Sequence, residues 1–170
     1  METTTTTKCV YLSGPISDPV TGLPREGWQR DFLDAEARLR RMGLTVVNPV
    51  DIAREVEDAF KWRYYYVGRP CSSDGGPDKP SRADYIMACL QRIKMAHEAG
   101  MLHGVYVIDV DKYDEDLVID PRESHGVMME LRMAELLGIP IFAEYVNARV
   151  DHSVYPNGEP GTIEEFAKED

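Results

Sequence analysis

The chain has 170 residues, of which 30 are acidic and 19 basic, and its formal net charge is −11. This length fits one domain with its own core, and the acidic balance argues against a broad nucleic-acid-binding surface or attachment to an anionic membrane. Three cysteines without C-x-x-C spacing argue against a disulfide scaffold or a zinc site and indicate a cytoplasmic protein. No apolar run has the length of a membrane span. We expect residues 1–7 to be a disordered tail and residues 8–170 to form the domain.

Strands and helices are predicted to alternate along the chain. Continuous apolar runs predict strands at 9–12, 44–47, 104–110 and 139–145. Helical spacing of apolar residues predicts helices at 28–42, 81–98 and 126–137, with a short helix at 162–168. This alternation is typical of a single α/β domain whose doubly wound parallel sheet is covered on both faces by helices.

Residues 57–80 interrupt the alternation. They are aromatic at first, then rich in Gly, Pro and Ser, and they show no sustained period. We predict a long loop inserted in the domain. Loops of this length are often lids or binding loops, and the aromatic cluster 62–66 fits either such a lid or a subunit contact.

Parallel α/β sheets bind ligands beyond the carboxyl ends of their strands. The first predicted strand ends at Ser13-Gly14-Pro15. Gly14 removes a side chain where the backbone comes close to something, either a ligand or the packed core. The sequence alone leaves both interpretations open.

Glu130 stands on the apolar face of the third predicted long helix, three residues after Val127 and four before Ala134. Burial there would raise its pKa, and tight positioning would suit a nucleophile or a general acid/base. The alternative is a solvated helix glutamate like Glu135. Ser124, at the entrance of this helix, is an N-cap candidate, with phosphate contact as the functional alternative.

Four segments carry a resemblance to a known family. They are VYLSGPIS near the start, LRRMGLTVVNPVD after the first predicted helix, GVYVIDVDKYDED in the third strand and SHGVMMELRMAELLGIPIF near the end. Together they resemble the nucleoside 2-deoxyribosyltransferase family, nearest its branch of nucleoside 5′-monophosphate N-glycosidases. The resemblance implies a flavodoxin-like, Rossmann-like fold, a nucleotide or nucleoside as ligand, and a homodimer or larger homo-oligomer whose subunits complete each other's sites.

The resemblance also implies roles for single residues. Glu130 matches the nucleophile that attacks the anomeric carbon, and Tyr11 matches the tyrosine that holds this carboxylate by a hydrogen bond. The expected substrate-binding residues around them are Ser13, Gly14, Pro15, Ile16, Ser17, Ser124 and Gly126. Ser124 stands where transferases acting on free nucleosides carry an aspartate. A serine at a helix start donates to a phosphate that an aspartate would repel, which favours a 5′-monophosphate.

The chain departs from the family at Cys89. The family usually carries an aspartate at this position, where it helps to position the sugar and the reacting base. Asp84 stands five residues earlier, about 500 degrees around the helix, and so projects from a different face. Asp84, Asp109 and Asp111 are the candidates for the missing role.

The expected reaction is a two-step displacement with retention, in which Glu130 attacks the anomeric carbon and the glycosyl ester passes to water or to another base. This chemistry requires no metal or organic cofactor, and the four histidines show no metal-ligand spacing. Two alternatives remain. One is a nucleotide sensor of the same fold without turnover, which Cys89 favours; the other is a flavin mononucleotide electron carrier, for which the first loop lacks a Ser/Thr-rich phosphate cradle.

Overall fold

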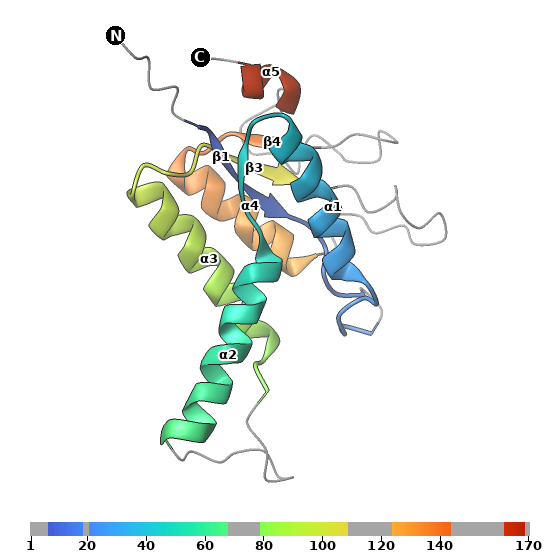
Figure 1. Ribbon diagram of the computed structural model, residues 1–170, viewed down its shortest axis with the longest axis vertical. Coiled ribbons are helices and arrows are strands. Elements are labelled where there is room, and N and C mark those ends of the chain that lie inside the picture. Colours follow the sequence, from blue (N-terminus) through green and yellow to red (C-terminus); the bar gives the residue numbers. More distant parts are fainter. Residues whose placement is uncertain (1–6, 19–20, 68–78, 109–123, 144–161, 169–170) are drawn as a thin grey trace.

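The computed structural model describes residues 7–18, 21–67, 79–108, 124–143 and 162–168 (Figure 1). Within these ranges the strands are β1 (Cys9–Ser13), β2 (Thr45–Val47), β3 (Gly104–Val107) and β4 (Ile141–Ala143). They pair in parallel in the order β2-β1-β3-β4. The predicted single α/β domain with a parallel sheet is confirmed.

The helices cover both faces of this sheet (Figure 1). They are α1 (Trp28–Arg41), α2 (Pro49–Val67), α3 (Arg82–Glu98), α4 (His125–Leu137) and α5 (Ile163–Lys168). Alternate residues of β1 point to opposite faces, so Val10 and Leu12 join a core with α1 and α5, whereas Tyr11 joins a core with α3 and α4. The two cores are the physical basis of the doubly wound arrangement. No helix in the described ranges is long and apolar enough to cross a membrane.

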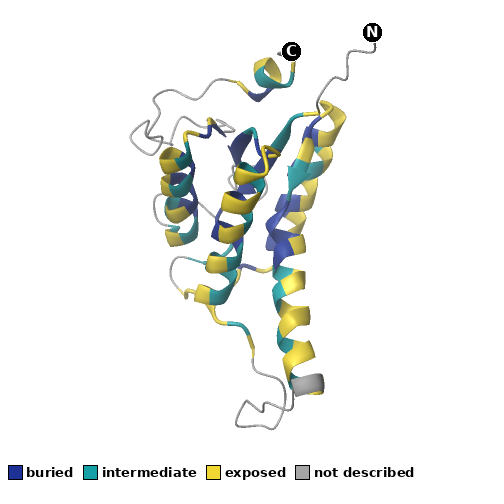
Figure 2. Cartoon of the chain, turned by 90° about the vertical axis from the view of Figure 1, so that its left-hand side faces the viewer, coloured by how far each residue is buried: buried dark blue, intermediate teal, exposed yellow. Residues whose placement is uncertain are grey.

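The prediction of a loop over residues 57–80 is wrong for its first half. Residues 57–67 continue helix α2, which begins at Pro49. The Asn48 side chain caps its start by accepting a hydrogen bond from the Val50 amide at 3.0 Å. Val56 of α2 still packs against the core. The far half of α2 is mostly exposed (Figure 2). In this half, Trp62 and Tyr65 are 57% and 70% exposed. Among the described residues, this half of the helix contributes no side chain to either hydrophobic core, which agrees with its lack of an apolar period. Residues 68–78 lie outside the described ranges.

Two strand boundaries also differ from the prediction. β3 ends at Val107 rather than at residue 110, and residues 109–123 lie outside the described ranges. β4 starts at Ile141 rather than at residue 139, because the Ile139 amide donates to the Ala134 carbonyl at 2.9 Å and so completes the end of α4. Pro140, which has no amide hydrogen, follows at once.

Gly14 is explained by packing. A Cβ atom at this position would lie 2.8 Å from Cδ1 of Ile108, closer still to its Cγ1, and 3.2 Å from Cζ of Phe32. The backbone therefore passes directly over the core formed with α1. Of the two interpretations left open by the sequence, close approach to the core is the one that the structure shows.

We predict that Gly14→Ala lowers the free energy of unfolding by about 1 to 3 kcal/mol, because the added methyl group overlaps Ile108. Urea unfolding measures the change. Gly126→Ala is the matched control, since its Cβ would have its nearest neighbour at 3.9 Å and the change should stay within about 1 kcal/mol of zero. Equal effects of the two substitutions would contradict the packing explanation.

Candidate active site

A cavity of about 530 Å³ opens at the carboxyl end of β1. Its walls come from the loop after β1, from α1 and α2, and from the first turns of α3 and α4. Among the residues expected from the sequence, those that line it are Gly14, Ile16, Ser17, Cys89, Ser124, Gly126 and Glu130. The topology thus brings together segments separated by more than a hundred residues, at the edge of the sheet where parallel α/β proteins bind ligands.

Glu130 forms part of the cavity floor and is 8% exposed. Burial raises the pKa of its carboxyl group to about 8, and the hydroxyl groups of Ser13 and Tyr11 act in the opposite direction. Burial therefore favours the protonated form of this carboxyl group. The alternative of a solvated glutamate does not hold for Glu130, whereas Glu135 is exposed.

Three buried polar atoms around Glu130 have no hydrogen-bond partner of good geometry within the described structure, and two of them belong to residues that do not line the cavity. They are Oη of Tyr11, Oγ of Ser13 and Oε2 of Glu130. The pKa of Tyr11 is raised well above its usual value, first by burial and then by the neighbouring Glu130 and Cys89. Buried polar atoms are rarely left unsatisfied in proteins. The hydroxyl groups of Ser13 and Tyr11 lie close enough to Glu130 to lower its pKa, so the three side chains form one buried polar cluster beside the cavity.

Cys89 lies in α3 close to Glu130 and Tyr11, and it is 7% exposed. Burial raises the pKa of its thiol to about 12, and the charge of Glu130 adds to this rise, whereas the Tyr11 hydroxyl opposes it. Cys89 is therefore a neutral thiol among the residues that line the cavity.

Of the other predicted substrate-binding residues, Asp84 and Ser124 form hydrogen bonds at the starts of helices. Asp84 closes a capping box at the start of α3, where its Oδ2 accepts from the Ser81 amide at 2.7 Å, and this bond lowers its pKa. Asp84 is not among the residues that line the cavity. Ser124 caps α4, accepting from the Val127 amide at 3.3 Å, and still borders the cavity. Asp109 and Asp111 lie outside the described ranges.

Arg25 fixes the loop that forms one wall of the cavity. Its Nε and Nη2 donate to the Pro15 carbonyl at 3.1 and 2.6 Å, and its Nη1 pairs with Asp31 at 3.1 Å. Its amide also donates to the Ile16 carbonyl at 2.8 Å. The ion pair is buried, so removal of either partner would leave an unpaired charge, at a cost of about 3 to 5 kcal/mol. Arg25 is a positioning residue for this loop.

The sequence carries a signal for this ion pair, which does not appear among the predictions. Asp31 lies three residues after Trp28 and four before Ala35, which places a carboxylate on the buried face of α1. Glu130 was singled out on the same spacing in α4. A charged residue on an apolar stripe indicated a buried polar interaction in both helices.

Glu57 and Tyr85 also line the cavity and were not predicted. The Tyr85 hydroxyl donates to Oε1 of Glu57 at 3.1 Å, which links α3 to α2 beside the cavity. Burial, and then this bond, raise the pKa of Tyr85 to about 12. Because the two residues are 28 positions apart in the sequence, no local sequence pattern predicts their contact.

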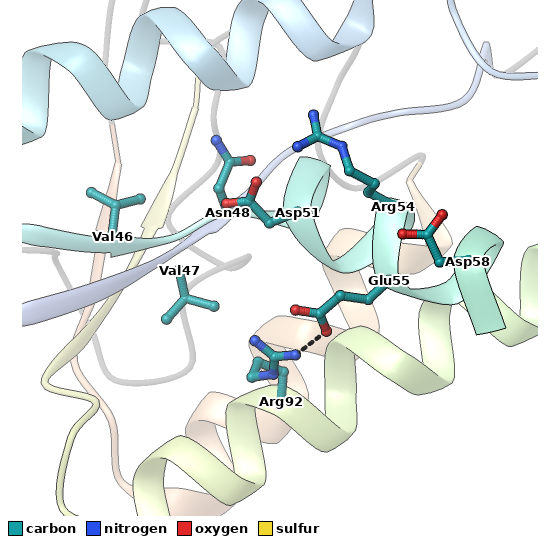
Figure 3. A pocket seen from close by; sticks show the side chains of 8 residues that line it. All are labelled: Val46, Val47, Asn48, Asp51, Arg54, Glu55, Asp58 and Arg92. Carbon is teal, nitrogen blue, oxygen red and sulfur yellow. Dashed lines mark hydrogen bonds and ion pairs between the residues drawn. The ribbon is translucent and has the colours of Figure 1, made fainter.

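A second pocket of about 460 Å³ lies between the end of β2 and the helices α2 and α3 (Figure 3). Its lining is strongly charged, and Arg92 pairs there with Glu55. None of the residues expected from the sequence lines it. Within the described ranges, no group of His, Cys, Asp and Glu side chains is arranged to hold a metal ion.

Searches for similar family models, curated proteins and solved structures found no match.

We predict that Glu130→Gln becomes more stable than the wild type as the pH rises. Between pH 4.5 and about 8 the unfolded chain ionises Glu130 while the folded protein keeps it protonated, so wild-type stability falls with pH in this window. Above about pH 8 the variant should exceed the wild type by a few kcal/mol, and below pH 4 the difference should vanish. Denaturant unfolding from pH 4 to 9 measures it. Exposed Glu135→Gln is the control, and the same pH dependence in both variants would rule out burial of Glu130 as the cause.

Proposed function

We propose that the chain cleaves the N-glycosidic bond of a nucleoside 5′-monophosphate, with Glu130 as the nucleophile. The observation that carries the proposal is a carboxyl group on a cavity floor at the carboxyl edge of the sheet, with a buried oxygen that has no hydrogen-bond partner among the described residues. The Tyr11 hydroxyl beside it supports the same assignment. The resemblance to nucleoside 5′-monophosphate N-glycosidases supplies the reaction class.

In the proposed first step, an oxygen of ionised Glu130 forms a bond to the anomeric carbon while the bond from that carbon to the base nitrogen breaks. In the free protein, burial favours the protonated form of Glu130. The positive charge that develops on the sugar favours the ionised form, which acts as the nucleophile. The Tyr11 hydroxyl donates to the carboxylate and orients it. Water or a second base then takes the glycosyl group from the ester, and two inversions give net retention.

The walls of the cavity support a phosphate-bearing ligand. The hydroxyl groups of Ser17 and Ser124 and the side chain of Arg82 belong to its lining. Serine at position 124 donates to a phosphate, where an aspartate would repel it. The resemblance further supports a homodimer or larger homo-oligomer, and the cysteine content supports a cytoplasmic location.

A second candidate function is a nucleotide sensor of the same fold without turnover. Cys89 is the observation that favours it, because a thiol on the cavity floor stands where the family carries a carboxylate. Nucleotide binding by wild type and Glu130→Ala alike, without base release, would support the sensor.

We predict that the wild type releases free base from a nucleoside 5′-monophosphate faster than from the matching nucleoside, and that Glu130→Gln lowers the rate at least about 1,000-fold. Loss of the Tyr11 hydroxyl in Tyr11→Phe should cost about 100-fold. Because the nucleophile must be ionised, kcat/KM should rise with pH and level off above about 8.

Chromatography of free base from a panel of ribo- and deoxyribonucleotides and nucleosides measures these rates. Glu135→Gln on the same helix is the control and should keep wild-type activity. Base release that survives in Glu130→Gln would remove Glu130 from the role of nucleophile.

A further inference from the structure

The cavity floor presents one carboxyl group among neutral donors. Tyr11, Ser13 and Cys89 bring O–H or S–H groups to Glu130, which is more than nine-tenths buried and keeps Oε2 without a partner among the described residues. An ionised carboxylate in such a place is costly unless a positive charge lies close to it.

The described lining of the cavity supplies little positive charge of its own. Arg82 is its one basic side chain, and it is exposed at the first residue of α3. Arg82 lies seven residues before Cys89, about 10 Å along the helix axis. Glu57 adds a further carboxyl group to the same lining. A ligand that carries a positive charge would therefore supply what the floor lacks.

Cys89 bears on which base can leave. A neutral purine or pyrimidine that takes the electron pair of the broken bond departs readily only when an acid protonates it. The Cys89 thiol, with its pKa raised to about 12, is a poor acid for this purpose. A base that is already a cation needs no proton, because the electron pair neutralises its ring nitrogen.

We infer that the cavity selects nucleoside 5′-monophosphates whose base is a fixed cation, a pyridinium ring joined to the anomeric carbon, and this inference rests on the proposed function. The bond from Glu130 to the anomeric carbon forms as the bond from that carbon to the ring nitrogen breaks, and a neutral pyridine leaves. Water then hydrolyses the ester, which yields a sugar 5-phosphate, restores the carboxylate and releases one proton. Trp28 and Tyr85 add aromatic surface to the cavity, and aromatic faces attract flat cations.

The first test compares kcat/KM for nicotinamide mononucleotide with kcat/KM for AMP and CMP. We expect the pyridinium nucleotide to be cleaved at least 100-fold more efficiently. Cys89→Asp places a carboxyl group beside Glu130 and should raise cleavage of the neutral nucleotides relative to the pyridinium nucleotide at least 10-fold. Glu135→Gln, an exposed change on α4 outside the cavity, should leave the ratio unchanged.

A binding measurement separates this inference from the proposed function. The carbocyclic analogue of nicotinamide mononucleotide resists cleavage, and its dihydropyridine form has nearly the same shape without the positive charge. Calorimetry should show at least 10-fold tighter binding of the cation to the wild type at pH 8.5, with the preference lost in Glu130→Gln.

Equal binding of the two forms, or neutral nucleotides cleaved as efficiently as the pyridinium nucleotide, would overturn the inference and leave the proposed N-glycosidase in place. Preferential binding of the cation without cleavage of any nucleotide would overturn the proposed function and retain the cation subsite.

Discussion

Burial of one carboxyl group, that of Glu130, at the carboxyl edge of the sheet is the constraint on which the site depends. The apolar face of α4 carries Glu130 into the interior between Val127 and Ala134, and the end of β1 brings the hydroxyl groups of Tyr11 and Ser13 to meet it. Desolvation of the carboxyl group opposes folding at high pH, where it would be charged. The fold retains this group although it lowers stability at high pH, and Oε2 of the carboxyl group has no hydrogen-bond partner of good geometry among the described residues.

The loop after β1, which forms one wall of the cavity, is fixed by several contacts. Arg25 reaches the Pro15 carbonyl and pairs with Asp31, while the backbone at Gly14 lies against Ile108. Each of these contacts ties the loop after β1 to the core formed with α1. The loop can therefore present Ile16 and Ser17 to a ligand without first being ordered by it, which lowers the entropic cost of binding.

Local patterns were sufficient to predict the sheet and the helices α1, α3, α4 and α5, because their apolar residues recur at strand or helix spacing. The same reasoning predicted no helix between residues 48 and 80 and so missed α2 entirely, and the exposed residues of its second half, such as Trp62 and Tyr65, carry no burial pattern. It placed Glu130 correctly on a buried face, but the contact between Glu57 and Tyr85 and the capping use of Asp84 depend on neighbours or geometry that a single sequence does not display.

The proposed function depends on one step, the formation of a covalent bond between Glu130 and the sugar. The most direct measurement is to incubate the protein with a 2′-fluoroarabinosyl nucleoside 5′-monophosphate, chosen because fluorine beside the anomeric carbon slows breakdown of a glycosyl ester, and to record the intact mass. We predict a mass increase equal to one fluorinated sugar phosphate, located at Glu130 by peptide mapping and absent in Glu130→Gln. Base release without such an adduct, or an adduct on another residue, would contradict the claim.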